Sequence, residues 1–228
     1  MAGSSRSPFC ASANYPKADQ LYREVLASRR ASFAAEHEAV LSLTASLARL
    51  LADWAWAERT NLVAAEVTRL TAESGIDQSL LTSAATASVE RAREAERLLR
   101  DCLALRQRGT NATHWRTGDV RSRLGGALLV VAVTDPALTL AARLSKLTEA
   151  GPLLLEGNEA LQQMTKIDDR KYQRDALTRL VRFHEAWDEL APNTGKAAQA
   201  AEWKTKLADF DKAGIKKTDA APTSQPSR

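Results

Sequence analysis

The side chains that most often carry catalysis or bind metals are few in this sequence and lie far apart. The three histidines, His37, His114 and His184, are separated by 77 and 70 positions, and the cysteines are Cys10 and Cys102. A metal site needs several such ligands close together, and nucleophilic catalysis needs a base beside its nucleophile. No segment supplies either cluster, so we predict no metal site, no cofactor and no catalytic residues.

Nucleotide-binding and phosphoryl-transfer motifs are also missing. The sequence contains neither a phosphate-binding loop nor the glycine-rich loop, His-Arg-Asp and Asp-Phe-Gly motifs of a protein kinase. The pair Gly125-Gly126 lies inside a predicted helix, where close helix packing is the simpler explanation. Acidic residues mostly alternate with basic ones, as in ERAREAER at 90–97, which is typical of a solvated helix face. The sequence therefore predicts a protein that is not an enzyme.

The net charge of +4 is concentrated at the two ends of the chain. Residues 1–17 carry an excess of two positive charges and so do residues 211–228, which leaves residues 18–210 neutral. A nucleic-acid-binding protein carries a basic patch on its folded part. We therefore do not expect a nucleic acid partner.

Composition favours helices packed around an apolar core. Apolar residues make up 44% of the chain, Ala, Leu, Arg and Glu dominate, and almost no window alternates with period two. The longest apolar run, LGGALLVVAV at 124–133, is about half of what a membrane-spanning helix needs. We expect an all-α, cytoplasmic protein without a membrane segment.

The spacing of apolar residues predicts about nine helices in one domain over residues 15–212, with disordered tails at 1–14 and 213–228. The first helix begins near Pro16, and the others are expected at about 38–53, 55–73, 77–90, 91–108, 116–133, 137–163, 169–189 and 196–210. Thr134-Asp135-Pro136 and APNTG at 191–195 are predicted helix breaks, and Gly151-Pro152 is a candidate break.

Isolated residues with chemical potential have structural explanations. His37 and His114 occupy matching loop positions, which favours a structural role over metal binding, and His184 replaces an apolar residue, so we expect it to be partly buried. Cys102 lies on an apolar helix face and is predicted to be a core residue. The tryptophans are predicted to pack against a neighbouring hairpin rather than to form a ligand platform; they are Trp54, Trp56, Trp115, Trp187 and Trp203.

Part of the sequence matches another part after a shift of 77 positions. The matching residues are Ala18, Leu21, His37, Leu47 and Leu51, which fall on Ala95, Leu98, His114, Leu124 and Leu128. Small residues recur beside large ones at helical spacing, which allows antiparallel helices to approach closely. One hairpin cannot bury its apolar face, so neighbouring hairpins must stack. We interpret the pattern as repeated helix hairpins.

These features resemble tetratricopeptide (TPR) repeats of the long-loop, kinesin-light-chain-like variant. RRASFAAEHEAV (29–40) and RQRGTNATHWRT (106–117) resemble the histidine-containing loop between its repeats. Five segments within 93–207 resemble the repeat region that follows the kinase domain in some bacterial serine/threonine kinases; they are EAERLLRDCLALR, WRTGDVRSRLGGALL, EAGPLLLEGNEAL, DALTRLVRFHEAW and AAEWKTKL. The resemblance implies a degenerate TPR-like α-solenoid of stacked antiparallel hairpins.

The sequence departs from that family in three places. Extra residues occur near 130–147 and at 189–195, and the stretch 54–92 fits the repeat poorly, without a definable register. A shift of 77 corresponds to two short units and not to two units of the long-loop variant. We therefore expect an irregular array.

The resemblance implies a concave groove lined by residues 38–53, 115–131 and 170–187. It assigns partner binding to polar residues on these segments, namely Arg49, Asp53, Asp119, Ser122, Asp175, Arg182 and Glu185. The Lys, Asn and Arg cluster with which some family members clamp a terminal carboxylate is not found, so that ligand is not predicted. Ordinary solvent exposure is the alternative explanation for these residues.

Three functions follow as alternatives. The first is a non-catalytic scaffold or adaptor that binds a peptide or helix of another protein in the groove. The second is a regulatory repeat region associated with a bacterial serine/threonine kinase. The third is an oligomerisation module, because an uncapped end of a helical array exposes core surface to self-association.

Overall fold

The computed structural model of the chain describes residues 14–72, 78–108, 114–164 and 170–219, and these contain seven helices and no strand. The helices are α2 (Tyr15–Ser32), α3 (Glu38–Ala72), α4 (Gln78–Arg108), α5 (Trp115–Thr134), α6 (Leu140–Gln162), α7 (Arg170–Leu190) and α8 (Lys196–Asp219). The all-α prediction is confirmed. The predicted tails, 1–14 and 213–228, lie largely outside the described residues.

The prediction of nine helices is wrong, because two predicted breaks do not exist. Residues 38–53 and 55–73 belong to one 35-residue helix, α3, and residues 77–90 and 91–108 belong to α4, which has 31 residues. Neither predicted junction contains glycine or proline, so nothing there interrupts the backbone hydrogen bonds of a helix.

Four other predictions about helix boundaries have clear outcomes. The breaks at 134–136 and 191–195 are confirmed, because α5 ends at Thr134 and α7 is separated from α8 by residues 191–195. Gly151-Pro152 does not break α6. Pro152 is exposed, so its ring meets solvent rather than a neighbouring helix. Helix α8 continues to Asp219, beyond the predicted end at residue 210.

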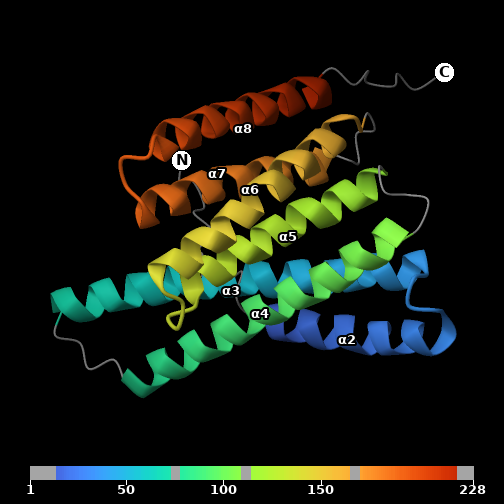
Figure 1. Cartoon of the computed structure of the whole chain (residues 1–228), viewed down its shortest axis with the longest axis horizontal. Helices are drawn as coiled ribbons and strands as arrows, with labels where there is room; N and C mark the ends of the chain where they lie inside the picture. The colour runs from blue at the N-terminus through green and yellow to red at the C-terminus, as the bar shows by residue number, and fades with distance from the viewer. Residues whose placement is uncertain (1–13, 73–77, 109–113, 165–169, 220–228) are drawn as a thin grey trace, which may run out of the picture.

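Consecutive helices run in opposite directions and pack side by side from α2 to α8 (Figure 1). Helices α3, α5 and α7 also contact one another in sequence order, so they form one layer. Ion pairs join helices of the other layer, from Arg23 of α2 to Glu94 of α4 at 2.8 Å and from Arg100 of α4 to Glu149 of α6 at 2.5 Å. Helix α8 packs on α7.

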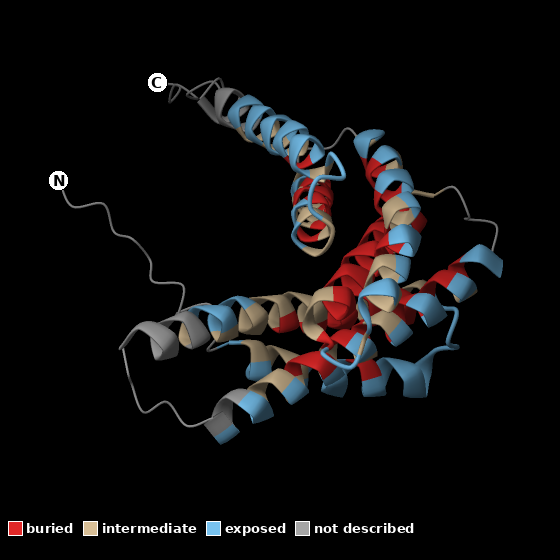
Figure 2. Cartoon of the chain, turned by 60° about the vertical axis from the view of Figure 1, so that its left-hand side comes forward, coloured by how far each residue is buried: buried red, intermediate tan, exposed pale blue. Residues whose placement is uncertain are grey.

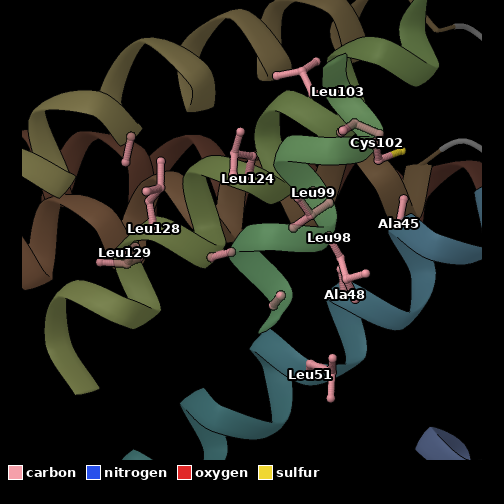
Figure 3. Close-up of a cluster of buried hydrophobic side chains, with 14 of the residues drawn as sticks. Ala45, Ala48, Leu51, Leu98, Leu99, Cys102, Leu103, Leu124, Leu128 and Leu129 are labelled. Atoms are coloured by element: carbon pink, nitrogen blue, oxygen red, sulfur yellow. The ribbon is translucent and has the colours of Figure 1, made fainter. Parts of the chain in front are cut away.

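The core lies where α3, α4, α5 and α6 meet. Figure 2 shows buried residues gathered in the middle of the array, with exposed residues at its ends and along α8. Leucines of α3, α4 and α5, including Leu51, Leu99 and Leu128, belong to one cluster of buried side chains, which Figure 3 shows in part. Cys102 joins them and donates its thiol hydrogen to the Leu41 carbonyl at 3.5 Å, which confirms it as a core residue. None of the described helices is both long and apolar enough to cross a membrane.

Glycines allow α5 and α6 to approach closely. A Cβ atom added at Gly157 of α6 would lie 2.6 Å from the Ser122 backbone nitrogen and 2.7 Å from the Gly118 carbonyl oxygen. A Cβ added at Gly125 would lie 2.6 Å from Leu154 Cγ. The close-packing explanation of Gly125 is therefore confirmed, and α5 is held in place by backbone-to-backbone contact with α6.

The two matching histidines begin equivalent helices. His37 Nδ1 accepts a hydrogen bond from the Ala39 backbone N–H at the start of α3, and His114 Nδ1 accepts one from Arg116 at the start of α5, both at 3.2 Å. The predicted structural role is thus confirmed as helix capping. The shift of 77 positions superposes α3 on α5. It corresponds to one pair of helices that includes the long α3 and α4, and not to two short units as predicted.

Candidate partner-binding groove

A cavity of about 310 Å³ lies between α3 and α7, and we refer to it as the groove. Its lining residues are Tyr15 of α2, Asp53, Trp56 and Ala57 of α3, and Arg174, Asp175, Thr178, Arg179 and Arg182 of α7. A smaller recess extends it toward α5, where Gly126, Leu129 and Val130 contribute to the floor. Helix α5 thus lies under the groove, and α3 and α7 form its two walls.

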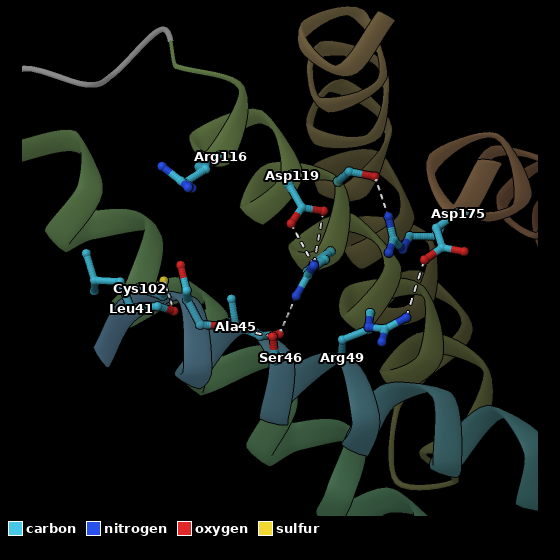
Figure 4. A network of polar contacts seen from close by, with 12 residues as sticks. Leu41, Ala45, Ser46, Arg49, Cys102, Arg116, Asp119 and Asp175 are labelled. Atoms are coloured by element: carbon cyan, nitrogen blue, oxygen red, sulfur yellow. Dashed lines mark hydrogen bonds and ion pairs between the residues drawn. The ribbon is translucent and has the colours of Figure 1, made fainter. Parts of the chain in front are cut away.

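One ion pair crosses from wall to wall. Arg49 Nη1 of α3 donates to Asp175 Oδ2 of α7 at 3.3 Å (Figure 4). Both side chains are more than one-third exposed, so this pair is worth about 1 kcal/mol or less. A ligand that offers either residue a better partner can therefore replace the contact at small cost.

Arg179 crosses the floor of the groove over a glycine. Its Nη1 donates to the Ser122 hydroxyl of α5 at 2.9 Å. A Cβ added at Gly126 would lie 2.9 Å from Arg179 Cδ, so the glycine leaves the space that the arginine stem occupies. Burial lowers the pKa of Arg179 from its ordinary value, and the nearby carboxylates of Asp119, Asp175 and Asp53 act in the opposite direction.

A second arginine fastens α5 to α3 beneath the groove. Arg123 donates to both carboxylate oxygens of Asp119, at 3.0 and 2.7 Å, and its Nη1 donates to the Ala45 carbonyl of α3 at 2.9 Å. Arg123 and Asp119 are both buried. This bidentate pair has satisfied hydrogen bonds, so its role is to fix the floor rather than to meet a ligand.

Aromatic rings on α3 hold cationic side chains at the rim. The guanidinium of Arg182 lies 4.9 Å from the centroid of the Trp56 ring, and that of Arg59 lies 5.6 Å from it. Trp54, two residues earlier, stacks on Tyr15 at 5.8 Å and carries Arg91 at 3.7 Å. Arg59 and Arg91 also pair with the carboxylates of Glu189 and Glu58, whereas the ring contact orients Arg182 without neutralising it.

Tyr15 extends the groove to the start of α2. Burial raises the pKa of its phenol, and the Asp53 carboxylate raises it further, while Arg182 and Arg49 lower it. The phenol hydrogen therefore remains bound at neutral pH, and Tyr15 offers a hydrogen-bond donor at the edge of the cavity.

The charges on the groove lining do not cancel locally. Arg49 pairs with Asp175, and Arg174 pairs with Asp211 of α8 at 2.8 Å. Among the residues that the structure describes, no carboxylate lies within 4.0 Å of the guanidinium nitrogens of Arg179 or Arg182. Two arginines therefore face the cavity without an ion-pair partner, although residues 18–210 are neutral as a whole.

The structure brings together four of the seven predicted binding residues at the groove. Arg49, Asp53, Asp175 and Arg182 lie on its walls or its deeper recess. Asp119 and Ser122 lie beneath it, fully engaged in hydrogen bonds. Glu185 does not face the groove, because its carboxylate pairs with Lys204 of α8 at 2.7 Å.

Sequence reasoning missed Arg179, Trp56 and Tyr15. Arg179 lies four residues after Asp175 and three before Arg182, so helical spacing places it on the same face of the helix. This spacing could have identified Arg179 as a groove residue. Trp56 was predicted to pack against a neighbouring hairpin; it packs partly buried against the core and also lines the groove. Nothing in the sequence indicated that Tyr15 would reach α3.

A larger cavity of about 390 Å³ lies between α2, α3 and α4. Its walls are mainly apolar, with Leu26, Leu41 and Leu98 among them, and its rim carries the Arg23–Glu94 ion pair. No three His, Cys, Asp or Glu side chains of the described residues gather closely enough to hold a metal ion.

Comparisons with protein-family models, with curated proteins and with solved structures find no match to this chain.

Proposed function

We propose that the chain is a non-catalytic adaptor that binds a peptide or a helix of another protein in the groove between α3 and α7. The observation that carries the proposal is the pair of cavity-facing arginines, Arg179 and Arg182, that have no carboxylate partner among the described residues. Folded proteins pair most charges that they partly bury. Charged groups that a fold positions and leaves unpaired in a cavity are suited to a ligand.

We also propose that the helices form a degenerate TPR-like array. Its support is the packing order, in which each helix contacts the next and α3, α5 and α7 contact one another. In such an array the first helices of successive hairpins line one face, and that face binds extended or helical segments. The equivalent histidine caps of α3 and α5 add support, because they mark the same point in two units.

The experiment that tests the adaptor function is a pull-down with the full chain and a groove-filling variant, Thr178→Trp. Thr178 lies at the centre of the α7 wall and is half-buried, so an indole there occupies the cavity without changing charge. We expect mass spectrometry to identify a protein that the wild type retains and the variant loses, with equal helicity by circular dichroism. Identical sets of retained proteins would contradict the proposal. A kinase domain as the retained protein would instead support the kinase-associated alternative.

Self-association is a second candidate that one observation favours. Leu21 and Val25 lie four residues apart on α2 and are 52% and 46% exposed, whereas Leu98, the counterpart of Leu21 in α4, is 6% exposed. No described helix covers that face of α2. Light scattering of the full chain and of Leu21→Ser/Val25→Ser tests this candidate, which requires an oligomer that the double variant dissociates.

A further inference from the structure

We propose that the segment bound in the groove is acidic, and that an Asp or Glu carboxylate of the partner binds between Arg179 and Arg182. This inference rests on the adaptor function proposed above and names the chemistry of its partner. It is carried by the placement of the two arginines in a cavity whose other basic residues, Arg49, Arg123 and Arg174, already have carboxylate partners.

Charge complementarity is the first argument. Arg49 and Arg174 each have a carboxylate partner, so an incoming anion gains most at Arg179 and Arg182. Arg179 and Arg182 are three residues apart on α7, which places them on the same helix face. A guanidinium offers two parallel N–H donors that match the two oxygens of a carboxylate, so the pair can hold one carboxylate from two sides.

The arginines are held in place before a ligand arrives. Arg179 lies over Gly126 and is fixed by the Ser122 hydroxyl, and Arg182 lies on the Trp56 ring. Side chains that are already oriented lose less conformational entropy on binding. The contacts that hold them are not ion pairs, so an anion can bind without first displacing a carboxylate.

A protein carboxylate fits this groove better than a nucleic acid does. Asp53 and Asp175 lie on the two walls, and they would repel a strand that carries a phosphate at every nucleotide. An acidic peptide can place one carboxylate at the arginines and apolar or neutral groups beside the aspartates. Its apolar groups would meet Trp56 and Ala57, which line the α3 wall.

The test selects peptides without assuming a sequence. A phage library of random 12-residue peptides is panned on the full chain, and enriched peptides are synthesised with a fluorescein label and titrated by anisotropy. The titrated proteins are the wild type, Arg179→Gln/Arg182→Gln, Arg179→Lys/Arg182→Lys and Thr178→Trp. The control is Arg97→Gln/Arg108→Gln, which removes the same charge from exposed positions on α4.

We expect enriched peptides to be rich in Asp and Glu and to bind the glutamine variant about tenfold or more weakly. The lysine variant should recover part of this loss, because it keeps the charge but not the bidentate geometry. The α4 control should bind as the wild type does, and circular dichroism should show equal helicity throughout.

Three other results would overturn the inference. Selected peptides that are neutral or basic, and whose binding is lost in Thr178→Trp but unchanged in Arg179→Gln/Arg182→Gln, would refute the acidic partner and leave the adaptor function standing. Peptides that also bind Thr178→Trp normally, or a selection that enriches no peptide, would refute both. A fluorescein-labelled single-stranded oligonucleotide that binds more tightly than every selected peptide, and is lost in the glutamine variant, would assign the site to nucleic acid.

Discussion

The contact between α5 and α6 predicts a large effect from a single methyl group. In Gly157→Ala the new Cβ would lie 2.6 Å from the Ser122 backbone nitrogen, 2.7 Å from the Gly118 carbonyl oxygen and 2.7 Å from Ser122 Cβ. Two of these three atoms are backbone, so no side-chain rotation can relieve the overlap, and the helices must separate. Separation would strain the buried contacts between α5 and α6 and shift Ser122, which holds Arg179.

The magnitude follows from two opposing terms. Overpacking of a well-filled interior costs about 1–3 kcal/mol, and rigid backbone neighbours favour the upper end of that range. Replacing glycine by alanine inside a helix contributes about 1 kcal/mol in the opposite direction. We therefore expect Gly157→Ala to lower the free energy of unfolding by about 2 kcal/mol, which moves the urea midpoint by about 1 M for a slope near 2 kcal/mol per M.

The assay is urea unfolding followed by circular dichroism at 222 nm, with Gly126→Ala as the matched control. At Gly126 the nearest atom to an added Cβ is Arg179 Cδ at 2.9 Å, which belongs to a flexible side chain that can move. The control should therefore be as stable as the wild type or more stable by up to about 1 kcal/mol. Equal midpoints for Gly157→Ala and Gly126→Ala would refute the claim that backbone contact positions α5.

Three further predictions concern charged and titratable groups. Burial lowers the pKa of His184 to about 4, so between about pH 6.5 and 4 the unfolded chain binds a proton that the folded chain does not. The free energy of unfolding should therefore be highest above pH 6.5 and fall by up to about 1.4 kcal/mol per pH unit below it. Urea unfolding of His184→Phe should lose this pH dependence. The Asp135 side chain is 2% exposed and accepts hydrogen bonds from Arg93 at 2.9 and 2.5 Å and from the Ala137 N–H at 3.0 Å. Asp135→Ala removes these contacts and should lower the free energy of unfolding by about 2–3 kcal/mol. The Tyr15 phenol should ionise above its ordinary pKa of about 10 in an absorbance titration at 295 nm, and Asp53→Asn should bring that pKa closer to the ordinary value.

Helix type was predictable here, and helix length was not. Alanine- and leucine-rich segments with helical spacing specify helices wherever they occur, and the breaks at 134–136 and 191–195 carry proline or glycine that end a helix locally. The junctions inside α3 and α4 lack such residues, and the chain stays helical through both. Whether a helix continues past such a point depends on which neighbour covers each half, and the local sequence does not contain that information.

The candidate site was likewise predictable in part. Arg49 and Asp175 were assigned to the groove through the resemblance to tetratricopeptide repeats, and they lie on facing helices and pair with each other. The burial of Asp119 and Ser122 was not predictable, because it results from Arg123 and Arg179, which reach them from the same helix and from α7. Long arginine side chains decide which polar groups are neutralised, and their direction is set only once the helices are packed.

The length of α3 gives the molecule a mechanical property. The 15 residues of α3 that follow Ala57, the last α3 residue of the groove lining, extend about 22 Å at about 1.5 Å per residue. Figure 1 shows the end of α3 projecting together with the start of α4. A tilt of α3 by about 5° at the groove would therefore move its far end by about 2 Å, so that a small change in groove width would produce a displacement at a distant surface.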